Sequence, residues 1–132
     1  MSIFRFEDSP RPDSAAFVAT LPRGIKSIAV LFHELDRQLK FPEHFGANWD
    51  ALWECICDLS WLPSGAVVIE HHDLPLAEDV AEAKIYLSIL EGAVRKLSGS
   101  RDHELFVVFP PENRDRISWL LRSIAYEQSR LE

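Results

Sequence analysis

Several residue types that define other classes of protein are scarce in this sequence. Only two of its 132 residues are cysteine, Cys55 and Cys57. They lie too close together to staple a fold, so we expect reduced thiols in a cytoplasmic protein. No apolar run approaches the ~20 residues of a membrane span, and the first residues lack the basic and apolar stretches of a signal peptide. Neither a glycine-rich phosphate loop nor a nucleophile motif is present, and we expect no cofactor.

Basic residues are also scarce in the middle of the chain. Residues 33–91 carry three basic and twelve acidic side chains, a net charge of −9, whereas the flanking segments each carry +1 and the whole chain −7. A nucleic-acid-binding protein needs the opposite patch, so we expect no direct contact with nucleic acid. An acidic surface attracts cationic partners or only keeps a protein soluble.

Hydrophobic periodicity predicts one α/β domain over residues 1–132. A β-prone run at 15–21 and two apolar runs rich in β-branched residues, at 66–70 and 104–109, predict three strands. Helical spacing predicts helices over 25–40, 49–59, 76–97 and 114–130. Two buried strands flanking the long helix indicate a βαβ unit, and hence a parallel three-stranded sheet covered by helices. The helix after Pro111 is either packed on the domain or an interaction arm; we expect its Trp119 and Tyr126 in the core rather than on a dimer face.

The residues that point most clearly to a function lie in segment 41–59. With Asn48 as the helix N-cap, five side chains point away from the buried face of Leu52, Ile56 and Leu59. They are Asp50, Trp53, Glu54, Cys57 and Asp58. Like charges spaced i, i+4 and i+8 destabilise a helix slightly, and the helix dipole compensates this only at Asp50. An exposed tryptophan beside carboxylates is typical of a protein interface. Alternatively, Trp53 packs under the loop and the acids form a solvated face.

Residues 42–55, PEHFGANWDALWEC, resemble the loop and second helix of the barstar family, the intracellular inhibitors of the secreted ribonuclease barnase. The resemblance covers residues 15–110 and implies a barstar-like three-stranded parallel sheet packed with helices; the additional C-terminal helix predicted over 111–132 lies outside it. It also implies an inhibitor rather than an enzyme, with a basic microbial ribonuclease as partner, no metal and no membrane contact. The oligomeric state does not follow from it, and we take a monomer as the starting assumption.

The resemblance assigns roles to individual residues. Glu54 stands where the family has the acid that enters the cationic pocket for substrate phosphate, and Asp50 where a second acid pairs with an arginine. Trp53 occupies the position of the interface tryptophan, Gly46 allows the backbone to approach the enzyme, and Asn48 opens the helix. Cys57 and Asp58 share the outward face and complete the predicted binding surface.

Three departures from the family pattern concern the partner. His44 replaces an aromatic hydroxyl residue and would add a pH dependence near neutrality. Glu54 is one methylene longer than the usual Asp. Where the family has an acid near the end of the later helix, this chain reads Val94-Arg95-Lys96-Leu97, with Glu91 one turn earlier.

Two other functions remain open on the sequence. The chain could be a barstar-fold binding module for a basic partner that is not a ribonuclease, such as another toxin or a regulatory protein. It could also be an enzyme with a metal at His71 and His72, which follow a buried strand. Adjacent residues on a strand point in opposite directions, however, and no further residue has ligand spacing to them.

Overall fold

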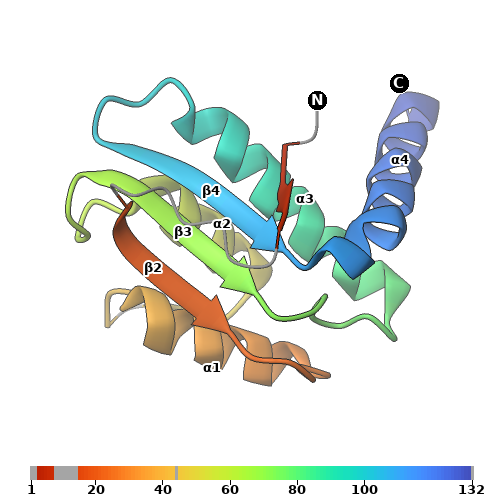
Figure 1. Ribbon diagram of the computed structural model, residues 1–132, viewed down its shortest axis with the longest axis horizontal. Helices are drawn as coiled ribbons and strands as arrows, with labels where there is room; N and C mark the ends of the chain where they lie inside the picture. Colours follow the sequence, from red (N-terminus) through yellow and green to blue (C-terminus); the bar gives the residue numbers. More distant parts are fainter. Residues whose placement is uncertain (1–2, 8–14, 44, 132) are drawn as a thin grey trace.

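A computed structural model describes residues 3–7, 15–43 and 45–131 (Figure 1). Four parallel strands form one sheet in the order β1-β4-β3-β2. The strands are β1 (Arg5–Phe6), β2 (Ala15–Leu21), β3 (Gly65–His71) and β4 (His103–Phe109). The predicted α/β class and three of the strands are confirmed. The predicted number of strands was too low, because β1 has two residues and is too short to show a period-two pattern.

The register brings the same ends of the strands together. Leu21 of β2 pairs with His71 of β3, and Ile69 pairs with Val107 of β4. At the far edge Phe6 pairs with Phe109. The connections from β2 to β3 and from β3 to β4 contain helices whose buried residues share one core with the sheet, as expected for crossovers between parallel strands.

Four helices follow from local capping and periodicity: α1 (Ile28–Leu39), α2 (Trp49–Asp58), α3 (Val80–Leu97) and α4 (Arg114–Leu131). A short 3-10 turn, η1 (Pro111–Asn113), precedes α4. The side chains of Ser27, Asn48 and Asp79 accept hydrogen bonds from the first turns of α1, α2 and α3. The predicted starts of α1 and α3, at 25 and 76, were too early because these caps fix the true starts.

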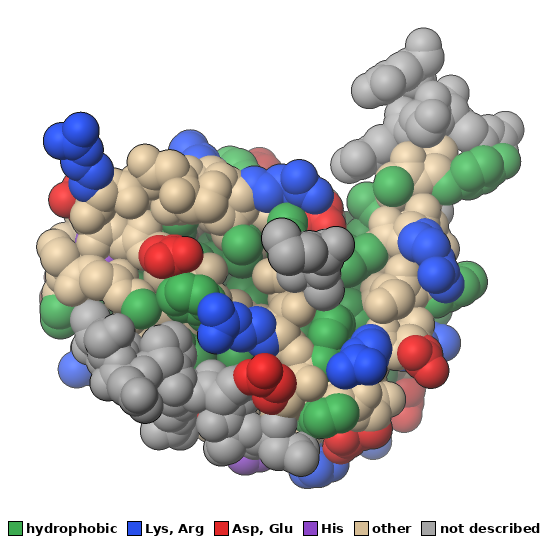
Figure 2. Space-filling view, turned by 45° about the horizontal axis from the view of Figure 1, so that its top comes forward, with side chains coloured by type: hydrophobic (Ala, Val, Ile, Leu, Met, Phe, Trp, Pro, Cys, Tyr) green, Lys and Arg blue, Asp and Glu red, His purple; other side chains and the backbone are tan. Residues whose placement is uncertain are grey.

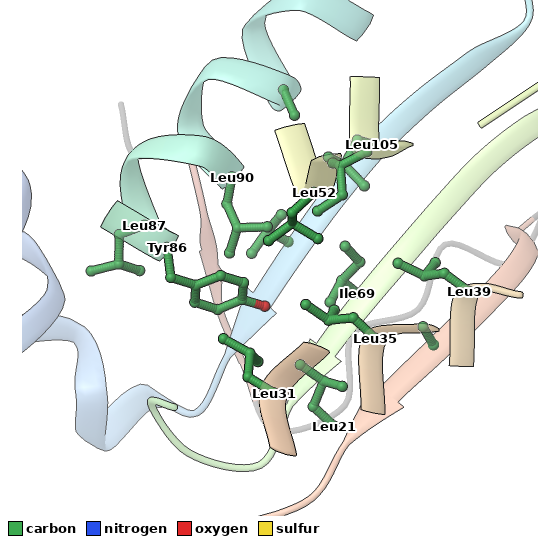
Figure 3. Packing of buried hydrophobic residues seen from close by; sticks show 14 of the residues in the cluster. Leu21, Leu31, Leu35, Leu39, Leu52, Ile69, Tyr86, Leu87, Leu90 and Leu105 are labelled. Atoms are coloured by element: carbon green, nitrogen blue, oxygen red, sulfur yellow. The ribbon is translucent and has the colours of Figure 1, made fainter. Parts of the chain in front are cut away.

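The core lies between the sheet and the helices α1, α2 and α3 (Figure 1). Leucines from all three helices converge on β3 and β4 (Figure 3). Leu31, Leu35, Leu52 and Leu90 are fully buried there. Because α2 rests on this core through Leu52 and Ile56, its opposite face is held outward on a rigid support.

The last helix, α4, lies beside α3 at the side of the molecule (Figure 1). Ile117 and Leu120 are fully buried, so this segment is a helix packed on the domain. The expectation that Trp119 and Tyr126 are core residues was wrong, because they are 48% and 65% exposed. The part of α4 that projects from the body shows hydrophobic and basic side chains together (Figure 2). Within the described ranges, no helix is long and apolar enough to cross a bilayer.

Candidate functional site

Aromatic rings fix the loop that leads into α2. The ring of Phe45 packs 4.8 Å from that of Phe41 and 6.0 Å from that of Phe32, measured between centroids. Phe41 also meets Trp61 edge to face, and the Nε1 of Trp61 donates a 2.9 Å hydrogen bond to the carbonyl of Leu39. The loop is thus anchored to the end of α1 and to the segment after α2. Its short backbone turn, from Phe45 N to Pro42 O at 3.0 Å, is held in one place.

Asn48 starts α2 as predicted. Its Oδ1 accepts a 2.8 Å hydrogen bond from the backbone N–H of Ala51, which satisfies one of the free donors of the first turn. Trp49 lies half-buried against Phe32, with ring centroids 5.0 Å apart, and its Nε1 donates to Glu82 of α3 at 3.2 Å. These contacts join α2 to both neighbouring helices and set its rotation.

That rotation presents three carboxylates to solvent. Asp50, Glu54 and Asp58 are all exposed along one side of α2. Glu54 and Asp58 border a recess of about 170 Å³. The recess is otherwise lined by Pro42, Phe45, Gly46, Ala51, Cys55 and Trp61. The structure therefore joins the predicted Gly46, Glu54 and Asp58 in one hollow with an apolar wall, and Asp50 lies one turn before Glu54 on the same side.

Trp53 lies on the side of α2 that faces α3. It is 36% exposed, and its ring sits on Gly92, where an added Cβ would come within 2.8 Å of its Cζ3 atom. Lys96, one turn further along α3, places its Nζ 5.8 Å from the centre of the same ring. Trp53 therefore packs on α3 rather than under the loop, and part of its ring stays open to solvent; its role at an interface stays a prediction.

The two cysteines are free and half-buried. Burial raises the pKa of the Cys55 thiol, and the nearby carboxylates of Asp58 and Glu54 raise it further. Burial also raises the pKa of Cys57, although the charge of Lys96 acts in the opposite direction. Neither thiol has the lowered pKa of a reactive cysteine, so Cys57 contributes surface to this face rather than chemistry.

One predicted site residue, His44, lies outside the described residues. The sequence did not single out Gly92 or Trp61, and it did not place Lys96 against Trp53. A tryptophan three residues after a helix has no spacing signal of its own, and contacts between α2 and α3 join residues that are far apart in the chain. Only the three-dimensional packing identifies them.

The structure does not favour a metal site at His71 and His72, because the ring nitrogens of His71 are already used in hydrogen bonds. His71 is buried, its Nδ1 lies 3.0 Å from the carbonyl of Val108, and its Nε2 lies 2.7 Å from the hydroxyl of Tyr86. Burial lowers the pKa of His71 to about 3, and its ring stacks on Phe109 at 4.0 Å. Both nitrogens are therefore occupied in holding β3, β4 and α3 together. Among the described residues, no group of three candidate ligands could hold a metal ion.

Comparison with known proteins places this geometry in a family. The family model described as Barstar (barnase inhibitor) matches residues 16–110. The curated protein "Putative ribonuclease inhibitor YrdF" of Bacillus subtilis (strain 168) is 42% identical over 41 residues, which are 31% of this chain and 45% of that protein. The aligned segment thus spans less than half of that relative. Because the family model covers most of the chain, from the second strand through the end of β4, the chain belongs to the barstar family.

Proposed function

We propose that this chain inhibits a basic, barnase-type microbial ribonuclease by occupying its active site with α2 and the preceding loop. Glu54 would take the position of the substrate phosphate. Asp50 and Asp58 would pair with cationic side chains on either side, and Trp53 would pack against the enzyme surface. The inhibitor would act in the cytoplasm and protect the producing cell from its own enzyme.

The chemistry of ribonucleases explains why a carboxylate suits this role. A ribonuclease active site must carry positive charge to bind a phosphodiester and to stabilise its transition state. A carboxylate forms charge-assisted hydrogen bonds with the same donors. It has no scissile bond, so it occupies the site without reacting. The net charge of −9 over residues 33–91 would also accelerate the encounter with a cationic enzyme.

The observation that carries the proposal is the placement of Glu54. Its side chain is exposed in the middle of a helix that is capped by Asn48 and supported by the core, beside a recess with an apolar wall. Because the helix backbone is already fixed, binding orders the Glu54 side chain without a further cost for ordering its backbone.

Gly46 adds independent support. Among the described residues, a Cβ at this position would meet Asn48 Nδ2 at 3.4 Å and the Ala51 Cβ at 3.8 Å, which are ordinary contacts. The fold itself therefore tolerates a side chain at position 46. Close approach of another molecule gives a reason for the glycine that internal packing does not.

Inhibition titrations test the proposal. A barnase-type ribonuclease cleaving a fluorogenic RNA substrate is titrated with the wild-type chain, Glu54→Ala and Asp58→Ala at low and moderate salt. Asp58→Ala is the comparison within the proposed interface: Asp58 is also a carboxylate on the same side, but it lies one turn later, at the end of α2, where Ser60 Oγ already donates to it at 3.1 Å. Glu54→Ala should cost about 1.5–3 kcal/mol, or roughly ten- to a hundred-fold in Kd.

The outcomes separate the possible partners. Stoichiometric inhibition that weakens several-fold more in Glu54→Ala than in Asp58→Ala supports a ribonuclease inhibitor acting through α2. Equal and negligible losses contradict the assigned role of Glu54. If the wild-type chain does not inhibit the ribonuclease, the partner is a different basic protein. A pull-down from the source cell would then identify it.

A further inference from the structure

The exposed face of α2 changes sign toward α3. Its outer side carries Asp50, Glu54 and Asp58, and its inner side carries Trp53 and Cys57. A cation lies next to Trp53: the Nζ of Lys96 is 5.8 Å from the centre of the indole ring. The charge of Lys96 is also felt at Cys57, one helical turn along α2. A positive edge therefore adjoins the acidic surface directly, without an intervening element.

Internal structure accounts for this lysine only in part. Lys96 and Arg95 lie in the last turn of α3 and are both exposed, and a cation there interacts favourably with the helix dipole. One residue suffices for that effect. Within the described part of the chain Lys96 takes part in no ion pair. Its ammonium group lies instead over the ring of Trp53, a residue of the proposed interface.

A molecule that covers Trp53 must also cover Lys96. The ammonium group of Lys96 lies 5.8 Å from the centre of the indole ring, so a partner that packs on the ring also comes close to the ammonium group. Enclosing an unpaired ammonium group is costly unless an acceptor of opposite charge faces it, and a like charge there is repelled. A partner that is basic throughout its binding surface would fit Glu54 but would be opposed at Lys96.

We propose, building on the function proposed above, that Lys96 selects the partner: the cognate ribonuclease is cationic where it meets Glu54 and presents a carboxylate where it meets Lys96 and Arg95. The chain then discriminates among related ribonucleases by the charge at one edge of their active sites. Glu54 provides affinity for the shared cationic centre, and Lys96 excludes enzymes whose neighbouring edge is basic.

A comparison of two enzymes tests this inference. The probes are two barnase-type ribonucleases, one with a uniformly basic edge around its active site and one with acidic residues in that edge. Inhibition constants are measured for the wild-type chain, Lys96→Glu and Lys96→Met, with Lys26→Glu as control. Lys26 is an exposed lysine before α1, so its reversal makes the same change in net charge away from α2. Circular dichroism and thermal melting verify that each variant is folded.

The wild-type chain should prefer the enzyme with the acidic edge. Lys96→Glu should shift the ratio of the two constants by roughly tenfold toward the uniformly basic enzyme, a range expected for reversing one exposed charge contact. Lys96→Met should shift it part of the way, and Lys26→Glu should leave the ratio within twofold.

The results distinguish failure of the inference from failure of the proposed function. An unchanged ratio in Lys96→Glu, or an equal shift in Lys26→Glu, overturns the selective role of Lys96 while inhibition itself stands. Absence of inhibition of both enzymes by the wild-type chain and by every variant overturns the proposed function and, with it, this inference.

Discussion

His71 makes the stability of the fold sensitive to acid. Its imidazole is buried, stacks on Phe109, and has both nitrogens in hydrogen bonds, with the carbonyl of Val108 and the hydroxyl of Tyr86. Its pKa is lowered from 6.5 to about 3, chiefly by desolvation; the neighbouring His72 acts in the same direction, and backbone hydrogen bonds to Val108 and Ile69 act in the opposite one. The folded chain therefore holds His71 neutral at pH values where the unfolded chain is already protonated.

The magnitude follows from proton linkage. The contribution of neutral His71 to stability is complete above pH 6.5 and is lost progressively as the pH falls toward 3. Between those values the unfolded chain binds one more proton at this site, so the free energy of unfolding falls by about 1.4 kcal/mol per pH unit. At pH 5 the loss is about 2 kcal/mol, a large part of the stability of a domain of this size.

Urea unfolding from pH 4 to pH 7 measures this slope. His71→Gln should be less stable than wild type at pH 7, because it disturbs two buried hydrogen bonds. Its slope against pH should be smaller by about 1.4 kcal/mol per unit, which is one proton. His33→Gln, at an exposed position in α1, controls for the removal of a histidine. Parallel slopes in wild type and His71→Gln would refute the reasoning.

Two further predictions concern the support of α2. Asn48→Ala should lower the free energy of unfolding by about 1 kcal/mol, because Ala51 N loses its 2.8 Å acceptor; Asn48→Asp should retain most of it, and equal urea midpoints for all three chains would show that the cap is not needed. Gly92→Ala should not raise the free energy of unfolding by the ~1 kcal/mol expected for this change inside a helix, because the new Cβ would lie 2.8 Å from Trp53. When Trp53 is first replaced by alanine, Gly92→Ala should raise the free energy of unfolding. If the effects of the two substitutions are additive in this double-mutant cycle, the contact is excluded.

The sequence predicted those parts of the site that depend on local rules. Asn48 caps α2 because a side-chain acceptor before an apolar helical pattern is a local signal, and Leu52 and Ile56 face the core because helical spacing requires it. From these two facts the outward placement of Glu54 follows. The family resemblance then gave that residue a role, which the titrations above test.

Features that depend on long-range packing could not be predicted in this way. Trp119 was expected in the core because it is large and apolar, yet α4 contacts the body through one face only and Trp119 lies off that face. The helical spacing of α3 does not predict that the hydroxyl of Tyr86 forms a hydrogen bond with His71 of β3. The contact of Trp53 with Gly92 and Lys96 likewise joins residues about 40 positions apart.

The position of β1 has a consequence for the order in which the chain assembles. β1 comes first in the sequence, but its neighbour β4 is the last strand to be synthesised, and Phe6 pairs with Phe109. Closing a loop of about 100 residues costs conformational entropy, and the strand contacts offset this cost only after the loop has closed. Among the described residues the pairing is short: β1 has two residues, to which the neighbouring Glu7 adds a backbone hydrogen bond to Phe109 and Phe4 a ring contact with Phe109. We therefore expect the first strand to join last, sealing an edge of β4 that would otherwise stay open to pairing with another chain during synthesis.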